Sequence, residues 1–347
     1  MSPPVGGGDA IAPRAVAAAR TAAGLRASQG PSPAGAKLPV DRWMPSREAA
    51  DVPCDDPGLG SLVVFPPRPE GPLAPSSFPN RWDTLAPGVR YAKTLINGQL
   101  THALVVEPGS AVTFWVGPDA EGGLGTRTVR QMAEGRVAAV NGSFSTLADA
   151  AVSRPVGPTV ARGETRVDSA TVKSGWGPVP RSFLGRDDKG RFFVGEAAAG
   201  EKASQLLLRL KAEGRVVKDL FGGNGVLLSE GKLADARARE VQGLNAGQAS
   251  RTPNARTVAG ATAEGRLVLL TAEGDAGAGR GVGVHELGQW LLQARQSDPA
   301  LVVQEAIILD GGGTAAMVVP GKGVDSRAGL YHRRITTGLV IERAPAR

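Results

Sequence analysis

Short apolar runs broken by glycine fill the chain from Val89 onward, and this texture limits the fold more than any other feature. The first three runs are Tyr91–Ile96, His102–Val106 and Val112–Val116. Each has the length of a strand and is short for a helix. The chain contains 48 glycines, and those between the runs supply the turn residues that join neighbouring strands. The pattern predicts a sheet-rich domain.

The same texture continues toward the C-terminus, with a few helical stretches between the strands. Amphipathic helices are predicted over Glu201–Glu213 and between Val284 and Ala294, and Thr126–Ala133 fits a short third helix. Further strands are expected at Arg136–Val140, Arg181–Gly185, Arg191–Val194, Arg256–Thr262, Leu267–Thr271, Ala306–Leu309, Ala316–Val319 and Ile335–Ile341. Many strands with few helices predict an α+β fold, a mixed and mostly antiparallel sheet domain with a few packing helices.

Residues 1–80 have a different composition, rich in Pro, Ala and Gly. Six prolines lie between Phe65 and Pro79. Proline fixes φ and removes a backbone donor, so this density disfavours regular structure. We predict an N-terminal arm or linker over 1–80, partly disordered and with one short helix at Arg14–Arg26, followed by a folded domain over 81–347.

The charge balance favours anionic partners. Lys and Arg number 40 against 33 Asp and Glu, which gives a formal charge of +7. The basic residues are scattered, and only 15 residues are aromatic. Nucleic-acid sites combine dense basic patches with stacking side chains. The sequence therefore predicts no nucleic-acid partner.

Cysteine and hydropathy exclude several other classes of protein. Cys54 is the only cysteine, so no intrachain disulfide can form. No run of 18 or more apolar residues predicts a membrane span, and residues 1–10 lack the pattern of a secretory signal. The spacing of His, Asp and Glu does not predict a metal site. A divalent cation is compatible with the chain, but no ligands are assigned to it.

The sharpest motif follows the predicted strand Ala306–Leu309. It is the sequence Asp-Gly-Gly-Gly-Thr at residues 310–314. The strand delivers the carboxylate of Asp310 to its end, and three glycines leave main-chain amides open to a ligand. The alternative is an ordinary turn in which Asp310 accepts a hydrogen bond from its own backbone. The motif is no phosphate-binding P-loop, because the Lys-Ser/Thr ending is missing.

Three other segments carry polar groups at strand ends. Asn141 and Gly142 follow the strand Arg136–Val140, although Asn-Gly is also the commonest hairpin turn. Arg256 enters a strand, where a lone Arg is usually solvated or ion-paired. Phe221–Gly225 has the composition of a glycine loop, which by itself is a weak signal.

Taken in order, these segments resemble the phosphodiester glycosidase family, from about Val89 to Ile341. Val137–Phe144 is similar to the family's Asn-Gly-Gly-Phe-Phe segment, and Leu309–Met317 belongs to the most specific part of the resemblance. The other matching segments are Pro155–Gly157, Phe221–Leu228 with Gly231, Arg256–Thr257 with Gly260, Leu267–Gly274, Glu286–Leu287 and Arg333.

The sequence departs from the family pattern at several positions. Glu273-Gly274-Asp275 stands where the family often has Asp-Gly-Arg, so an acid is kept and a cation is lost. Thr314 replaces the usual Ser and keeps its hydroxyl. The remaining departures are Ser143, Ser145 and Asp325.

The resemblance implies a hydrolase that cleaves an N-acetylglucosamine-like sugar from a sugar-1-phosphodiester in a glycan or cell-surface polymer. The leaving group would be a phosphate monoester, which is already an adequate anion, so cations that neutralise it can replace the general acid of other glycosidases. The expected catalytic residues are Asp310, Glu273 and Arg256. The expected substrate-binding residues are Asn141, Gly142, Gly311, Gly312, Gly313, Thr314 and Arg333.

The implied partner is a phosphorylated glycan, and such substrates favour an extracytoplasmic, bacterial or phage-like setting. Two alternatives stay open. The first is a non-catalytic glycan-binding or structural module with the same fold. The second is a hydrolase of ordinary glycosides that lack phosphate. The oligomeric state is not predicted.

Overall fold

The computed structural model describes residues 76–117, 119–120, 123–124, 127–149, 152–168, 181–234, 253–274, 280–322, 324–325 and 334–343. All of these residues belong to one compact unit. The helix predicted at Arg14–Arg26 lies outside the described residues.

The largest element is an eight-stranded sheet, called the large sheet below. Its strands, in spatial order, are β1 (Asp83–Ala86), β2 (Val89–Ile96), β3 (Gln99–Val106), β18 (Leu267–Ala272), β17 (Arg256–Thr262), β19 (Val303–Ile308), β15 (Gly225–Ser229) and β16 (Lys232–Leu233). All pairings between neighbours in it are antiparallel.

Two five-stranded antiparallel sheets complete the framework. The β7 sheet contains β21 (Val324–Asp325), β20 (Met317–Val319), β7 (Ala138–Asn141), β22 (Thr337–Ile341) and β4 (Val112–Val116). The β12 sheet contains β11 (Glu164–Val167), β10 (Thr159–Ala161), β14 (Val217–Gly222), β12 (Arg181–Asp187) and β13 (Phe192–Ala197). Two small pairs add β5 (Asp119–Ala120) with β6 (Gly123–Leu124), and β8 (Ser145–Asp149) with β9 (Val152–Pro155).

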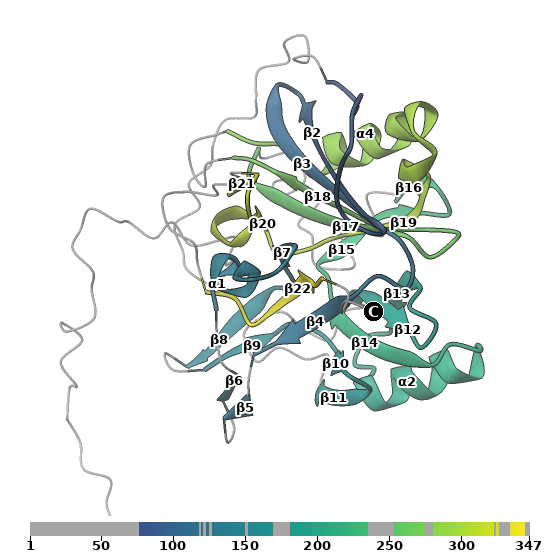
Figure 1. Cartoon of the computed structure of the whole chain (residues 1–347). Helices are drawn as coiled ribbons and strands as arrows, with labels where there is room; N and C mark the ends of the chain where they lie inside the picture. The colour runs from purple at the N-terminus through teal and green to yellow at the C-terminus, as the bar shows by residue number, and fades with distance from the viewer. Residues whose placement is uncertain are drawn as a thin grey trace, which may run out of the picture. The chain divides into compact units, whose positions relative to one another are not determined.

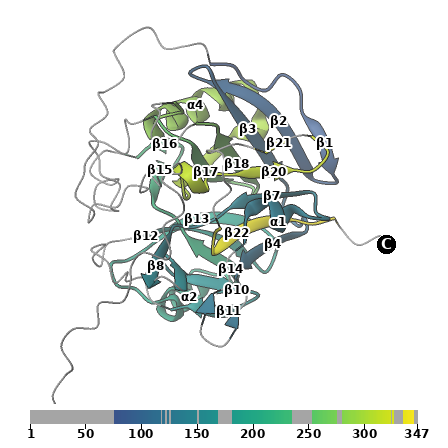
Figure 2. The ribbon, with the colours of Figure 1, turned by 90° about the vertical axis from the view of Figure 1, so that its left-hand side faces the viewer.

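The described helices lie on the outer faces of these sheets. They are α1 (Val129–Ala133), α2 (Ala203–Ala212) and α4 (Val284–Ser297), with short 3-10 turns at Pro299–Leu301 and Gly312–Thr314. In Figures 1 and 2, α4 covers the large sheet at the top and α2 lies against the β12 sheet at the bottom, with β7 and β22 between them. None of the helices in the described ranges is long and apolar enough to cross a membrane.

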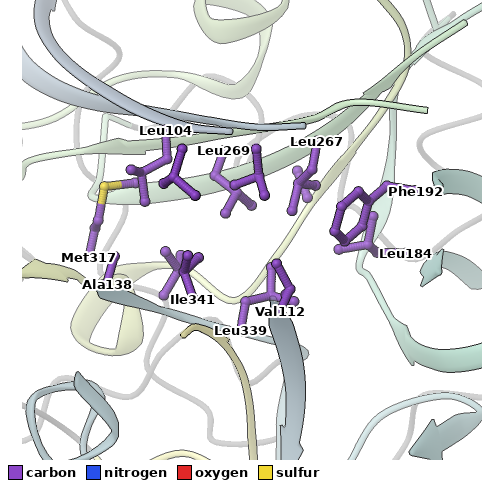
Figure 3. Packing of buried hydrophobic residues seen from close by; sticks show 14 of the residues in the cluster. Leu104, Val112, Ala138, Leu184, Phe192, Leu267, Leu269, Met317, Leu339 and Ile341 are labelled. Carbon is purple, nitrogen blue, oxygen red and sulfur yellow. The ribbon is translucent and has the colours of Figure 1, made fainter. Parts of the chain in front are cut away.

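The main core fills the space between the large sheet and the β7 sheet. Leu104 and Leu269 point from the large sheet toward Leu339 and Ile341 of β22, as Figure 3 shows. These side chains recur at every second position because alternate residues of a strand face opposite sides. The other side of the large sheet packs on α4, where Trp290 is buried.

The predicted α+β class and its mostly antiparallel sheets are confirmed. Most predicted elements match to within a few residues, and β4 and β17 match at both ends. The helix predicted from Thr126 begins at Val129, because the Thr128 side chain accepts a hydrogen bond from Gln131 N and caps it. The segment Phe221–Gly225 is not one glycine loop: it ends β14 in one sheet and begins β15 in another.

Residues 76–82 pack on the large sheet and α4. The carbonyl oxygen of Ser77 accepts hydrogen bonds from the Trp290 indole, at 2.9 Å, and from the Thr94 hydroxyl. The ring of Phe78 lies 5.8 Å from that of Trp290. The division of the chain at residue 80 stays a prediction, but the described residues just before it belong to the folded unit by these contacts.

Candidate active site

Asp310 lies at the C-terminal end of β19, where the large sheet meets the β7 sheet. Its side chain is buried, with 6% of the residue exposed. Its main chain is held on both sides: Asp310 N donates to Gly142 O at 3.0 Å, and Asn141 Nδ2 donates to Asp310 O at 2.8 Å. The position of Asp310 is therefore set by β7 as well as by its own strand.

The glycine turn after Asp310 is held by its own hydrogen bonds. Gly311 N donates to Asp310 Oδ1 at 2.9 Å, which is the self-bonded turn considered as the alternative from sequence. Gly312 has φ +56° and its amide donates to Ala255 O at 2.9 Å. The Thr314 hydroxyl donates to Gly311 O at 2.6 Å. Two of the three glycine amides expected to bind substrate thus have partners within the protein.

Arg256 lies beside this turn. It is the first residue of β17, it is buried, and a Cβ placed on Gly311 would come within 3.3 Å of its Nη1 atom. The guanidinium therefore approaches the backbone of residue 311 so closely that a side chain there would crowd it. The structure brings Arg256 and the Asp310 turn together, as the sequence suggested.

Glu273 lies at the same edge of the large sheet. It follows β18, whose last residue, Ala272, pairs with Arg256. Gly274 packs on the backbone of residues 254–255, where an added Cβ would lie 2.5 Å from Ala255 N. One strand, β17, separates β18 from β19, so the backbones of Glu273 and Asp310 are about 10 Å apart at a strand spacing of about 4.8 Å.

Two residues with no expected role lie next to Glu273: His102 contacts it directly, and Tyr91 contacts His102. His102 Nε2 lies 2.9 Å from Glu273 Oε1, and His102 Nδ1 lies 2.9 Å from the Tyr91 hydroxyl. The signal in the sequence was weak, because both polar side chains lie inside strands that are otherwise rich in apolar residues.

Asn141 is completely buried and its amide is engaged by three strand ends. Its Oδ1 accepts from the Thr257 hydroxyl at 2.7 Å and from Ala316 N at 2.9 Å, while Nδ2 reaches Asp310. Asn-Gly is thus not a hairpin turn here. A Cβ on Gly142 would lie 2.6 Å from Thr337 Oγ1, so the next residue must also be small.

Ser143, a departure from the family pattern, fits its place. Its backbone amide donates to Thr337 Oγ1 at 2.8 Å, and its hydroxyl lies 2.7 Å from the same oxygen.

A second group of buried polar residues, Arg181, Ser182 and Asn224, lies where β12 and the β14–β15 connection approach β19. Asn224 N donates to Ile308 O at 2.8 Å. Burial lowers the pKa of the Arg181 guanidinium.

Arg333, the last predicted substrate-binding residue, lies outside the described residues. Among the residues that the structure describes, no group of three His, Cys, Asp or Glu side chains could hold a metal ion. No metal is assigned.

Comparison with known proteins gives a family and a fold. The phosphodiester glycosidase family model matches residues 134–342, which is more than half of the chain. The search of curated proteins found no match to this chain. The catalytic domain of zebrafish N-acetylglucosamine-1-phosphodiester α-N-acetylglucosaminidase, autoinhibited by its pro-peptide, is similar with a TM-score of 0.50 and 20% identity, over 80% of this chain and 86% of that one.

A hypothetical protein from Synechocystis is also similar, with a TM-score of 0.50 and 12% identity over 79% of this chain and 64% of that one. At these identities the two structures support the fold alone. The family model matches the stretch that holds Asn141, Arg256, Glu273 and Asp310. The chain belongs to the phosphodiester glycosidase family, a family of hydrolases.

Proposed function

We propose that this protein hydrolyses a sugar-1-phosphodiester and releases an N-acetylglucosamine-like sugar from a phosphorylated glycan or cell-surface polymer. The observation that carries the proposal is the close approach of the Arg256 guanidinium to Gly311, in the turn that follows Asp310. A carboxylate beside a cation is the pair of charges that cleavage next to a phosphate requires. The name of the zebrafish relative, whose fold is similar, motivates the choice of sugar.

In this reaction, water adds to the anomeric carbon and the bond from that carbon to the phosphate oxygen breaks. The bonding electrons leave with the phosphate, so the products are a free sugar and a phosphate monoester. Asp310 orients the water and accepts its proton, or stabilises positive charge at the anomeric carbon. Its anchored backbone favours either role because a held carboxylate needs little reorganisation.

The leaving phosphate needs a cation more than it needs an acid. Arg256 can donate two parallel N–H groups to phosphate oxygens, and such charge-assisted bonds are about twice as strong as neutral ones. Glu273 supplies a second carboxylate at the same sheet edge. Arg333 is a further candidate for the phosphate.

The contacts of Asn141 support a positioning role. Three of its hydrogen bonds go to other strands, and it is fully buried. We therefore propose that Asn141 and Gly142 fix Asp310, whereas Gly313 and Thr314 are the better candidates to meet substrate, because both are partly exposed. An extracytoplasmic setting belongs to the same proposal, since it rests on the glycan substrate.

The test is turnover of the methyl diester of N-acetylglucosamine 1-phosphate, in both anomeric forms, by the wild type and Asp310→Asn. The Asn side chain keeps an acceptor for Gly311 N, so the turn should fold while the charge is lost. We expect kcat to fall at least about 100-fold. Asp188→Asn, in the exposed β12–β13 turn, is the matched control and should keep full activity.

Three other results would replace the proposal. Full activity of Asp310→Asn would remove Asp310 from the chemistry. Tight binding of the diester without turnover by the wild type would favour a glycan-binding module. Strong activity on nitrophenyl glycosides, which lack phosphate, would favour an ordinary glycosidase.

A further inference from the structure

A chain of hydrogen bonds runs from the core of the large sheet to its active edge. It links the Tyr91 hydroxyl, the His102 imidazole and the Glu273 carboxylate, at 2.9 Å for each step. Tyr91 and His102 are both 2% exposed, whereas the Glu273 side chain is 35% exposed. The buried end of the chain is thus closed to solvent, and its carboxylate end is accessible.

The strands place this chain in line with Asp310. His102 on β3 pairs with Thr271 on β18, which pairs with Thr257 on β17. Directly opposite residues of neighbouring strands share a face of the sheet. The Thr257 hydroxyl donates to Asn141, which in turn holds the Asp310 backbone. One row of polar residues therefore crosses three strands: at one end His102 contacts the Glu273 carboxylate, and at the other Thr257 reaches the Asp310 main chain through Asn141.

A purely structural role explains this row poorly. The neighbours of Tyr91 on the same face of the sheet are apolar, among them Leu104 and Leu269. Burying two polar side chains there stabilises the fold less than two apolar ones of the same size would. What the polar pair adds is a fixed hydrogen-bond donor for the partly exposed Glu273 carboxylate.

We propose that Tyr91 and His102 form a positioning pair for Glu273. The Tyr91 hydroxyl donates to His102 Nδ1, which places the imidazole proton on Nε2, and Nε2–H then donates to Glu273 Oε1. This arrangement gives every hydrogen bond one proton and buries no net charge. It fixes Glu273 Oε1 as a hydrogen-bond acceptor and so sets the direction in which the other carboxylate oxygen faces the site. The inference rests on the proposed function, in which Glu273 is the second carboxylate.

The surroundings of the pair agree with this assignment. Burial raises the pKa of the Tyr91 hydroxyl well above its usual range, and the nearby acids Asp83 and Glu273 raise it further. Tyr91 is therefore a neutral donor at physiological pH. Lys93, which lies opposite His102 in the register and is exposed, is the cationic neighbour on this face.

The kinetic test compares His102→Leu, His102→Gln and Tyr91→Phe on the methyl diester of N-acetylglucosamine 1-phosphate. His102→Leu should lower kcat about 10- to 100-fold with little change in KM, because the carboxylate is no longer held. His102→Gln keeps an N–H donor and should stay within about fivefold of wild type. Tyr91→Phe should lose about three- to tenfold.

A double-mutant cycle separates positioning from structure. If His102 acts through Glu273, the double variant His102→Leu/Glu273→Gln should be no less active than Glu273→Gln alone. Losses that multiply would overturn the proposal, as would a full-activity His102→Leu.

A readout that does not depend on activity is the ¹⁵N NMR tautomer of His102. We expect the Nε2–H form in the wild type and a mixture in Tyr91→Phe. The Nδ1–H form or a charged ring in the wild type at neutral pH would overturn the pair even if His102→Leu fails to fold. Inactivity of the wild type on every diester would instead refute the proposed function, and the tautomer would still decide whether the pair holds Glu273.

Discussion

At the scale of single residues, Asn141 connects three separate parts of the chain around Asp310. Its carboxamide makes three hydrogen bonds, to Asp310 O, Thr257 Oγ1 and Ala316 N, from a position with no solvent exposure. Each partner belongs to a different part of the chain. Removing the amide would leave buried groups without hydrogen bonds, which costs more than the bonds themselves contribute.

We therefore predict that Asn141→Ala lowers the free energy of unfolding by about 2–4 kcal/mol and reduces kcat more than KM, because Asp310 loses its anchor. Urea denaturation and kinetics on the phosphodiester measure the two effects. Gln293→Ala removes an exposed amide on α4 and should change neither. A stable and fully active Asn141→Ala would show that the Asn141 side chain does not position Asp310.

At the scale of elements, residues 76–82 and α4 depend on each other. The indole of Trp290 is buried, donates to Ser77 O at 2.9 Å and lies against Phe78. Trp290→Phe removes this donor and part of the ring volume. We expect a loss of about 1–3 kcal/mol in the free energy of unfolding, measured by urea denaturation.

The control for this prediction is Leu208→Ala on α2, where the side chain is 70% exposed and should matter little. Activity of Trp290→Phe should stay close to wild type at a temperature where the protein is folded, since α4 covers the face of the large sheet opposite the β7 sheet. An unchanged stability would mean that the hydrogen bond from Trp290 to Ser77 O does not contribute to the stability of the fold.

The elements themselves were largely predictable from the sequence, but their pairing was not. Short apolar runs and the glycines between them locate strands such as β17 and β18, because these signals are local. Asp310 and Arg256 were chosen as candidates because the strand-end segments that hold them match the family pattern in order along the chain. His102 and Glu273 are 171 positions apart, and only the pairing of β3 with β18 brings them together. Burial of Asn141 was likewise invisible, since it depends on three strand ends meeting.

At the scale of the whole molecule, the three main sheets converge on the end of β19. Asn141 arrives from the β7 sheet, and Asn224 N donates to Ile308 O from the connection between the β12 sheet and the large sheet. Arg186 of β12 makes an ion pair with Asp219, and its guanidinium lies over the ring of Phe114 in β4. This contact connects the β12 sheet to the β7 sheet. The site is therefore a product of the complete fold, and its geometry should be lost with global unfolding.

The pH dependence of global stability offers a test of the buried Tyr91. Burial, with Asp83 and Glu273, raises its pKa in the folded protein, whereas an unfolded tyrosine ionises near pH 10. Above that pH the unfolded chain releases a proton that the folded chain retains, so the contribution of Tyr91 is fully present below pH 10 and is lost as pH rises. Between pH 9 and 11 the loss should be about 1 kcal/mol. Tyr91→Phe, which cannot ionise, should show a shallower decline than wild type in urea denaturation over this range. Parallel declines in the two proteins would mean that Tyr91 ionises as easily in the fold as outside it, and the phenol would then not be the buried donor that His102 requires.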